Sequence, residues 1–384
     1  MRVYFFACEE RDNYQNDIVQ LAEGLEDLGV GFHSRCNYWQ KSPTGGDFLF
    51  QKSGGVRAED CDVVVVPYRW FRWIRIGDPV VRSRPMPPEV LRPRAKRPYT
   101  TVYLDDNDGY TTPALDPAFS AFDLVLRTKL NRRTWNPPNF KPWAIGLESR
   151  VIEATKDAPA FGQRRKAIYV NYNASHPFMH SSRRRAIDQL HPALHGILET
   201  YQPAFADLDA PPEDPQARLW WEQTNKRHSP EYYERLKTSQ ACSAFCGELL
   251  PPMPFSPRIF EVYGNKAELQ KMFWRALGRL DPRAERITSW DSFRFWETLA
   301  AGAVAFHVDL EKHGVALPVI PENWKHYAGV DFRNAARDLD RMKRSPAMLE
   351  DIAAAGREWA LRNYSPRATA ERFLDLIGQE RRFA

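Results

Sequence analysis

The sequence predicts an α/β protein built from two doubly wound domains. Its 384 residues are long enough for two domains, and hydrophobic residues make up 43% of them, which suffices for two cores. Residues 2–34 have the pattern of a strand, a helix and a second strand, which is how a doubly wound domain begins. The same alternation restarts after residue 164. We therefore expect two such domains with a cleft between them.

Five strands are expected in the first half of the chain. They are residues 2–7, 30–34, 62–66, 100–104 and 121–126. Residues 12–28 carry apolar side chains at helical spacing up to Gly29, which predicts a helix. Residues 62–66 contain four consecutive valines, so we expect this strand to be buried on both faces, as in a parallel sheet. No G-x-G-x-x-G follows the first strand, which argues against an ordinary dinucleotide-binding loop there.

The second half repeats the alternation after a crossing segment expected at residues 141–156. Strands are expected at 167–170 and 241–246, and helices at 182–198, 230–237 and 258–280. Residues 203–215 are rich in Pro, Asp and Ala and are expected to form a surface insertion. The chain is expected to end in three helices, at 334–343, 346–362 and 366–378.

Composition narrows the class of protein. Charged residues make up 27% of the chain and the formal net charge is +5, which argues against disorder and fits anionic ligands without requiring nucleic acid. No stretch approaches the roughly eighteen apolar residues of a membrane span, and the first residues lack a signal-peptide pattern. The cysteines are scattered, without a zinc-finger spacing. We therefore expect a cytoplasmic protein with reduced cysteines, and peripheral contact with a membrane stays open.

Residues 288–306 organise the second half. They have the pattern of a loop, a short helix, a glycine stop and a buried strand. Asp291 or Ser292 can cap the helix, because either side-chain oxygen can accept a first-turn N–H, and Gly302 can end it with a positive φ. Arg294 and Glu297 fall on the face opposite the apolar stripe. The start of the helix carries partial positive charge and spare N–H groups, which suit a diphosphate.

This stretch resembles the donor-binding motif of GT-B glycosyltransferases, in which a serine or aspartate precedes an aromatic residue, E-A-x-A-x-G and an apolar strand. The matching residues are Asp291-Ser292, Phe295-Trp296-Glu297, Leu299-Ala300-Ala301-Gly302 and Val304. The resemblance implies that Glu297 binds the ribose hydroxyls of a nucleotide sugar. It implies that the phosphates are held by Trp290, Asp291 and Ser292. The remaining donor-binding candidates are Arg294 and Asn173, which follows a strand beside the expected donor pocket.

One position departs from the pattern of some retaining members of that family. They carry a second acidic residue eight positions before the glutamate, where this chain has Ser289. The alternative interpretation is an amphipathic helix with an exposed Arg294–Glu297 pair three residues apart. Residues 256–261 look similar to the motif, but no buried strand follows them, and we interpret them as a helix start with Pro257 at its first position.

The resemblance implies two Rossmann-like domains facing a cleft, which is the GT-B architecture. The acceptor domain is expected at residues 1–155, the nucleotide-sugar domain at 156–365, and a C-terminal helix that packs back on the first domain at 366–384. In such sheets ligands bind beyond the carboxyl ends of the strands. Three segments follow first-domain strands and are expected on the acceptor side of the cleft: 9–13, 68–76 and 105–109.

Asp105, Asp106 and Asp108 place three carboxylates directly after the strand at 100–104. Close carboxylates repel one another, so at least one can have a raised pKa and take the proton of an attacking hydroxyl. We therefore expect the catalytic base in this cluster. By the same strand-end argument, the competing group is Glu9, Glu10 and Asp12. There are two alternatives for this cluster. It could form a turn, or Asp106 and Asp108 could form a GT-A-type D-x-D metal site.

The segment at 68–76 interleaves aromatic and basic side chains, of which Arg69, Trp70 and Trp73 are the acceptor-binding candidates. Aromatic faces stack on sugars, and arginines bind phosphates or carboxylates. A membrane-surface patch and an ordinary packed loop are the alternatives.

The expected function is transfer of a sugar, of the hexosyltransferase type, from a nucleotide sugar to a hydroxyl of a glycan, a lipid-linked molecule or a protein. No cofactor is required and no metal site is assigned, because a helix N-terminus and arginines can carry the leaving-group charge. A divalent metal is possible but not favoured. No nucleic-acid partner is expected. The alternatives are a metal-dependent GT-A-type enzyme, a nucleotide-sugar epimerase, and a non-catalytic protein that binds nucleic acid or a surface.

Overall fold

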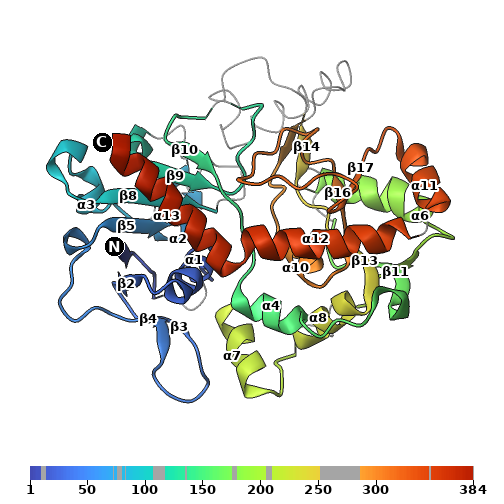
Figure 1. Ribbon diagram of the computed structural model, residues 1–384, viewed down its shortest axis with the longest axis horizontal. Helices are drawn as coiled ribbons and strands as arrows, with labels where there is room; N and C mark the ends of the chain where they lie inside the picture. Colours follow the sequence, from blue (N-terminus) through green and yellow to red (C-terminus); the bar gives the residue numbers. More distant parts are fainter. Residues whose placement is uncertain are drawn as a thin grey trace.

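The computed structural model describes residues 1–9, 14–71, 73–75, 80–82, 84–106, 117–134, 136–174, 180–204, 210–250, 286–345 and 347–383. Figure 1 shows two lobes side by side, each built around a sheet, with a long C-terminal segment that passes from one lobe to the other.

The first domain is built on a six-stranded sheet in the order β10-β9-β8-β5-β1-β2, in which every pairing is parallel. The strands are β1 (Arg2–Phe5), β2 (Gly31–Ser34), β5 (Val63–Pro67), β8 (Thr100–Asp105), β9 (Leu124–Arg127) and β10 (Phe140–Pro142). The five strands expected in this half are confirmed. The strand β5 is buried along its whole length, as its run of valines predicts, because strands cover it on both edges and helices on both faces.

The second domain is built on a five-stranded sheet in the order β12-β11-β13-β16-β17, again with every pairing parallel. The strands are β11 (Arg165–Tyr169), β12 (Glu199–Tyr201), β13 (Ser239–Ser243), β16 (Val304–Val308) and β17 (Ala328–Val330). Two parallel sheets with helices between their strands confirm the predicted α/β class with two Rossmann-like domains.

Smaller elements surround the first sheet. The helix α1 (Asn16–Asp27) follows β1. Between β2 and β8 the chain also forms two 3-10 turns, η1 (Ala58–Asp60) and η2 (Arg94–Lys96), and the short helix α3 (Pro88–Leu91). Residues 68–76 do not form a continuous loop after β5. They begin with the short helix α2 (Tyr68–Phe71), and β6 (Trp73–Arg75) then pairs antiparallel with β7 (Val80–Arg82). A further turn, η4 (Pro117–Ala121), precedes β9.

A hairpin of the first domain reaches the second domain. The strands β3 (Tyr38–Gln40) and β4 (Phe48–Phe50) pair antiparallel. The backbone N–H of Gln40 donates to Oε1 of Gln223 at 2.6 Å, at the end of α7 (Pro215–Gln223). The side chain of Gln223 returns a bond to the Gln40 carbonyl at 3.1 Å. The two domains are therefore joined on this side by a reciprocal amide contact.

The helices of the second domain differ from the prediction in one place. The expected continuous helix at 182–198 is divided into α5 (Ser181–Arg185), a π-helical turn at η6 (Ala186–Leu190) and α6 (His191–Ala193). Pro192 explains the break, because its nitrogen has no hydrogen to donate to the preceding turn. The other elements are α4 (Ser149–Thr155), η5 (Phe161–Gln163), α8 (Pro230–Lys237), β14 (Glu248–Leu250), β15 (Arg286–Thr288), α10 (Phe293–Ala300), α11 (Ala335–Arg344) and α12 (Met348–Tyr364). The expected helix at 258–280 and the stretch 256–261 lie outside the described residues.

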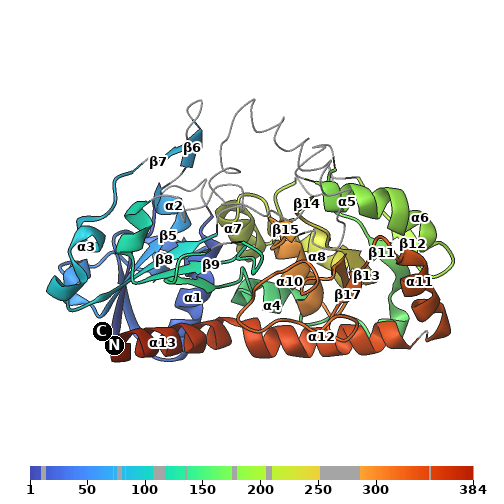
Figure 2. The ribbon, with the colours of Figure 1, turned by 90° about the horizontal axis from the view of Figure 1, so that it is seen from above.

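The last helix, α13 (Pro366–Phe383), leaves the end of α12 and lies along the first domain, where it contacts α1 (Figure 2). Ala370, Phe373 and Ile377 of α13 belong to the core of the first sheet. Gly24 of α1 permits this close contact, because a Cβ atom there would lie 2.0 Å from the carbonyl oxygen of Pro366.

The crossing between the domains bears on the predicted boundary at residue 155. Ala144, Ile145 and Leu147 lie in the core of the second sheet, and α4 contacts α8 and α10. This packing favours a crossing near residue 143, and we propose the boundary there.

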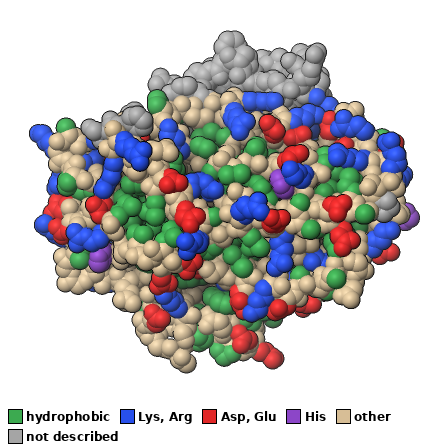
Figure 3. Space-filling view, viewed as in Figure 1, with side chains coloured by type: hydrophobic (Ala, Val, Ile, Leu, Met, Phe, Trp, Pro, Cys, Tyr) green, Lys and Arg blue, Asp and Glu red, His purple; other side chains and the backbone are tan. Residues whose placement is uncertain are grey.

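Two further features are the distribution of charge on the surface and the length and polarity of the helices. On the face shown in Figure 3, basic and acidic side chains are interspersed. Within the described ranges, each helix is too short or too polar to span a lipid bilayer.

Candidate active site

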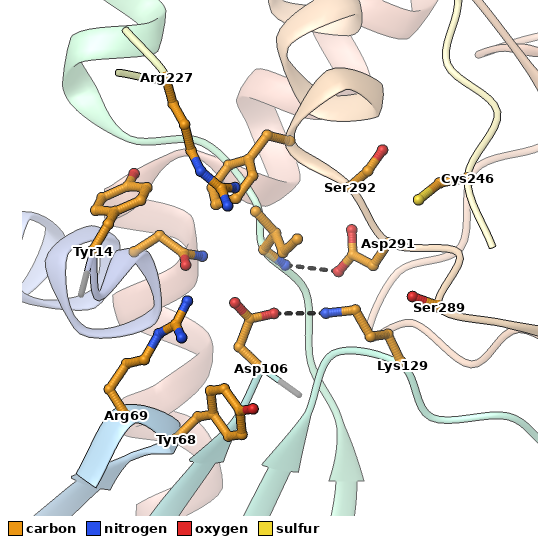
Figure 4. Close-up of a pocket in the computed structure, with 13 residues that line it drawn as sticks. Tyr14, Tyr68, Arg69, Asp106, Lys129, Arg227, Cys246, Ser289, Asp291 and Ser292 are labelled. Atoms are coloured by element: carbon orange, nitrogen blue, oxygen red, sulfur yellow. Dashed lines mark hydrogen bonds and ion pairs between the residues drawn. The ribbon is translucent and has the colours of Figure 1, made fainter. Parts of the chain in front are cut away.

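A cavity of about 190 Å³ lies between the two domains. On the first-domain side, its walls come from residues that follow β1, β5, β8 and β9, at the carboxyl ends of the strands, as the sheet topology predicts. On the second-domain side, they come mainly from the start of α10 and the loops beside it (Figure 4). The lining residues are Tyr14, Asn16, Tyr68, Arg69, Asp106, Lys129, Ile145, Arg227, Cys246, Ser289, Asp291, Ser292 and Phe293.

The predicted carboxylate cluster divides between the cavity and the core. Asp106 lines the cavity, where its Oδ1 forms an ion pair with Nζ of Lys129 at 2.8 Å and accepts from Oγ1 of Thr128 at 3.2 Å. The carboxylate of Asp105, the last residue of β8, is fully buried beside Arg127, whose Nε lies 3.6 Å away. Asp105 therefore cannot receive a proton from a ligand in the cavity, and Asp106 is the candidate base. Asp108 lies outside the described residues.

A second acid, Asp17, lies near Asp106. Asp17, in the first turn of α1, is 5% exposed, and its Oδ1 accepts from the N–H of Ile18 at 3.0 Å. Burial, together with the nearby charge of Asp106, raises the pKa of Asp17 to about 7. The positive charge of Arg69 partly offsets this effect. Asp17 is therefore a second acid, with a raised pKa, near the candidate base.

We expect Asp17→Asn to flatten the pH dependence of stability. A carboxyl group whose pKa rises from 3.8 in the unfolded chain to about 7 in the fold favours folding below pH about 4 and loses this contribution as the pH rises to about 7. Since one pKa unit corresponds to about 1.4 kcal/mol, the loss amounts to at most about 4 kcal/mol. Melting temperatures at pH 5 and pH 8 check this. If the melting temperature changes by the same amount between pH 5 and pH 8 in the wild type and the variant, Asp17 does not titrate in the folded protein.

The start of α10 is not capped in the way the sequence predicts. Oδ2 of Asp291 accepts from the N–H of Ile145 at 2.9 Å, and its Oδ1 accepts from the indole N–H of Trp296 at 2.6 Å. Ser292 occupies the N-cap position, but no side chain caps the helix there. The buried Oγ of Ser292 has no hydrogen-bond partner among the described residues. The end of the helix agrees with the prediction, because Gly302 follows it with φ +62.

Asp291 therefore fastens the start of α10 to the crossing segment and to the helix itself. Burial raises the pKa of Asp291 to about 7, although the Lys129 charge and the bond from Trp296 act in the opposite direction. Asp291 also lines the cavity, beside Lys129 in Figure 4.

Arg294, in the first turn of α10, has an incompletely satisfied guanidinium. Its Nε and Nη1 atoms are buried and have no hydrogen-bond partner in the described part of the chain. The guanidinium carbon lies 5.4 Å from the ring centroid of Tyr172. Arg183 approaches the same ring at 5.3 Å, but its Nε donates to the Phe245 carbonyl at 3.1 Å. Arg294 is thus a partly buried cation with two buried, unused donors beside an uncapped helix start, and buried donors without a partner are costly.

Glu297 is not on an exposed face, so the alternative of an exposed Arg294–Glu297 pair is wrong. Glu297 is 6% exposed. Its Oε2 accepts from the hydroxyl of Tyr232 at 2.7 Å and its Oε1 from the hydroxyl of Tyr233 at 3.0 Å. Each carboxylate oxygen keeps a lone pair for another donor. The role of Glu297 in ribose binding stays a prediction.

Two further donor candidates lie away from the cavity. Trp290 is fully buried and packs edge-on against Phe295 and His307, so its ring belongs to the core of the second domain. Asn173 is exposed, its carbonyl oxygen accepts from Arg183 at 3.1 Å, and it does not line the cavity. Of the donor-binding candidates, Asp291 and Ser292 reach the cavity wall, and Arg294 follows them in the first turn of α10.

Comparison with known proteins gives a fold. No family model matches the chain, and no curated protein matches it. An alpha-glucosyltransferase solved with UDP and a 13-mer DNA containing a central A:G mismatch is similar at a TM-score of 0.51 and 9% sequence identity, over 98% of this chain and 100% of that chain. The chain has the GT-B fold. An alpha-glucosyltransferase with UDP-glucose and DNA containing an abasic site is also similar, at a TM-score of 0.51 and 9% identity, over 98% and 99% of the two chains.

Within this GT-B fold, Trp70 does not present an open ring to a sugar. It is 8% exposed and packs edge-on against Phe6 at 5.0 Å. The guanidinium groups of Arg35 and Arg84 each lie 5.1 Å from its ring centroid, and its indole N–H donates to the Pro85 carbonyl at 3.2 Å. Its ring and its indole N–H both have partners within the protein, which does not favour an acceptor-binding role for Trp70, and that role stays a prediction.

The other two acceptor candidates have different positions. Arg69 lines the cavity and lies over the ring of Tyr68 at 5.4 Å. Trp73 lies in β6, and its side chain is outside the description. Arg69 is therefore the acceptor candidate that the GT-B cavity retains.

We expect Trp70→Ala to destabilise the protein by about 3–5 kcal/mol, the usual cost of removing a buried aromatic side chain. Chemical denaturation measures this loss, and Trp70→Phe should recover most of it because the ring packing remains. A rise in acceptor KM at unchanged stability would instead restore Trp70 as an acceptor-binding residue.

Several residues of the GT-B cavity were not anticipated. Lys129 follows β9 as Asp106 follows β8, so the strand-end argument could have found it. Tyr14 and Asn16 follow β1 and could have been found in the same way. Arg227 lies in the loop between α7 and α8, where no sequence pattern marks it, and it approaches the ring of Phe293 at 4.9 Å. Of the competing acids, Glu9 is exposed, and Glu10 and Asp12 lie outside the described residues.

Proposed function

We propose that this GT-B chain is a glycosyltransferase that moves a hexose from a nucleotide diphosphate sugar to a hydroxyl acceptor. One observation carries the proposal. The cavity between the domains has a paired, accessible carboxylate, Asp106, on one wall and Ser292, at the uncapped start of α10, on the other. Arg294 follows in the first turn of that helix. The carboxylate is suited to receive a proton and the helix start to hold a diphosphate.

The cavity supports a simple division of work. An acceptor hydroxyl oxygen forms a bond to the anomeric carbon of the sugar while the bond from that carbon to the diphosphate oxygen breaks. The hydroxyl proton passes to the carboxylate of Asp106, whose Oδ1 forms an ion pair with Nζ of Lys129 at 2.8 Å. The negative charge that develops on the diphosphate is stabilised by the N-terminus of α10 and by Arg294.

Uridine diphosphate is the first nucleotide to test. The two solved structures of similar fold contain UDP or UDP-glucose, which supports this choice of base and a glucose-like sugar. We propose Glu297, held by Tyr232 and Tyr233, as the ribose-binding carboxylate.

The proposed acceptor is a hydroxyl of a glycan, a lipid-linked molecule or a protein. Both similar structures were solved with DNA. For this chain, the formal net charge of +5 and the interspersed charges of the face in Figure 3 give little support to a DNA acceptor. The acceptor screen should include a duplex oligonucleotide, because sugar transfer to it would show that DNA is an acceptor.

A thermal-shift screen tests the donor proposal. A ligand that binds only the folded state raises the melting temperature by mass action. We expect UDP or a UDP-sugar to raise it, and ADP, GDP, CDP and TDP to serve as comparisons. A shift with none of these nucleotides and none of their sugars would contradict a nucleotide-sugar enzyme.

We expect transfer activity to survive chelation by EDTA. Within the described ranges, no group of three or more His, Cys, Asp or Glu side chains is placed to hold a metal ion. One oxygen of Asp106 is already paired with Lys129, and Lys129 and Arg294 supply positive charge. Activity measured before and after dialysis against EDTA checks this. Loss with EDTA and recovery with Mn²⁺ or Mg²⁺ would favour the metal-dependent alternative on Asp106 and Asp108.

A further inference from the structure

A continuous line of buried polar side chains leads from the cavity wall to Glu297. It begins at Tyr14, which lines the cavity, and passes through Glu148, Arg150 and Tyr233. Each of these side chains belongs to a residue that is at most 6% exposed. The line crosses from the first domain to the second, because Tyr14 precedes α1 whereas Tyr233 lies in α8.

Arg150 is the centre of this line. Its Nε donates to Oε2 of Glu148 at 2.8 Å, its Nη2 to the hydroxyl of Tyr14 at 2.8 Å, and its Nη1 to the hydroxyl of Tyr233 at 2.9 Å. Tyr233 in turn donates to Oε1 of Glu297 at 3.0 Å. The planar fork of a guanidinium matches this arrangement, and the single ammonium of a lysine cannot reproduce it.

His228 completes the surroundings of the guanidinium. Its Nδ1 lies 3.1 Å from Nη1 of Arg150. Burial, and then the Arg150 charge, lower the pKa of His228 to about 2, so the ring is neutral. Because a guanidinium can only donate, Nδ1 must be the acceptor and the ring proton lies on Nε2. His228 therefore fixes the orientation of Arg150 without competing for its acceptors.

Tyr14 is held in a second way. Its ring stacks on Phe293, the first residue of α10, at 5.7 Å and on Trp39 at 5.8 Å. Its hydroxyl donates to Oε1 of Glu148. A shift of Tyr14 therefore moves both the start of α10 and the partners of Arg150.

We propose that Arg150 is a positioning residue that couples the cavity wall of the first domain at Tyr14 to the ribose-binding carboxylate Glu297 of the second domain. This inference rests on the proposed function, because it takes Glu297 as the ribose ligand. It adds a link between the domains: a correctly docked first domain orients Tyr233 and Glu297, and nucleotide bound at Glu297 in turn favours docking of the first domain.

A double-mutant cycle on UDP binding tests the coupling, with Kd measured by isothermal titration calorimetry. Tyr14→Phe removes one hydroxyl and keeps the ring stack, and we expect it to raise the Kd for UDP about fivefold or more. Arg150→Lys should raise the Kd by a similar factor. In the Arg150→Lys background, Tyr14→Phe should not change the Kd for UDP further, because Arg150 no longer links Tyr14 to Tyr233 and Glu297.

The matched control is Tyr99→Phe. Tyr99 is a buried first-domain tyrosine whose hydroxyl donates to the Glu89 carbonyl at 3.0 Å, away from this network. We expect Tyr99→Phe to leave the Kd for UDP unchanged. If Arg150→Lys does not fold, Tyr233→Phe takes its place in the cycle, since it also removes a single hydroxyl.

The outcomes separate the two proposals. Independent effects of the two substitutions, whose fold-changes multiply, would mean that Tyr14 contacts the nucleotide directly, and this would overturn the role of Arg150. Unchanged Kd in Tyr14→Phe and Arg150→Lys would overturn it as well, while leaving the proposed function in place. A wild type that binds neither UDP nor any other nucleoside diphosphate would contradict the proposed function and this inference with it.

Discussion

Asp106→Asn is expected to lower kcat by about 10²–10⁴-fold, the usual scale for removal of a general base. The substitution keeps the shape of the side chain, and its amide oxygen can still accept from Lys129 and Thr128. The fold and the Kd for UDP should therefore remain close to those of the wild type. Steady-state kinetics with the identified donor, combined with calorimetric binding of UDP, check both parts.

The control for this substitution is Glu9→Gln. Glu9 is an exposed acid after β1, another strand of the same sheet, and it does not line the cavity. Activity of Asp106→Asn within a few-fold of the wild type, with loss in Glu9→Gln, would move the base to the other strand end. A fall in UDP affinity in Asp106→Asn that follows metal concentration would instead favour a metal-bridged donor.

Arg294→Met is expected to weaken UDP binding by roughly 10- to 150-fold, since hydrogen bonds to charged groups contribute about 1.5–3 kcal/mol. The unfolding free energy should stay unchanged or rise, because methionine removes a partly buried guanidinium whose buried Nε and Nη1 lack partners among the described residues. The two measurements together separate a role of Arg294 in binding from a role in the stability of the fold. Calorimetry with UDP and urea denaturation supply them.

Arg165→Met is the matched control for that variant. Arg165 lies in the second domain with its guanidinium 4.0 Å from the ring centroid of Tyr201. Like Arg294→Met, the substitution therefore removes an arginine that lies over a tyrosine ring. We expect its UDP affinity to equal that of the wild type. A clear loss of stability in Arg294→Met would show that the guanidinium is a structural partner of Tyr172, and equal UDP affinity would remove Arg294 from the donor site.

The fold could be predicted from the sequence because its signals are local. The valines at 63–66 form a buried strand, and the helix at α10 and the glycine after it lie where the apolar pattern and Gly302 place them. Two kinds of element were missed. The short strands of the β3–β4 hairpin carry no alternation long enough to recognise, and the π-helical turn at η6 depends on Pro192 inside an otherwise helical pattern.

The site was harder to predict because the partners of its residues are distant in sequence. Trp70 was expected to face a sugar, but Arg84 and the Pro85 carbonyl occupy it. The alternative interpretation placed Glu297 on an exposed face, but two tyrosines 64 and 65 residues earlier in the chain bind its carboxylate. Strand-end reasoning did locate Asp106, because the carboxyl ends of parallel strands meet at one edge whatever the tertiary partners are.

A crystal structure of the chain with UDP is the most direct test of the central claim. We expect the diphosphate to lie in the cavity between the domains, within hydrogen-bond distance of the first-turn N–H groups of α10 and of the Arg294 guanidinium. We expect the ribose hydroxyls to point to Glu297, and Asp106 to face the diphosphate across the space for a sugar. A diphosphate bound away from α10, or a ribose that contacts first-domain residues instead of Glu297, would contradict the proposed function.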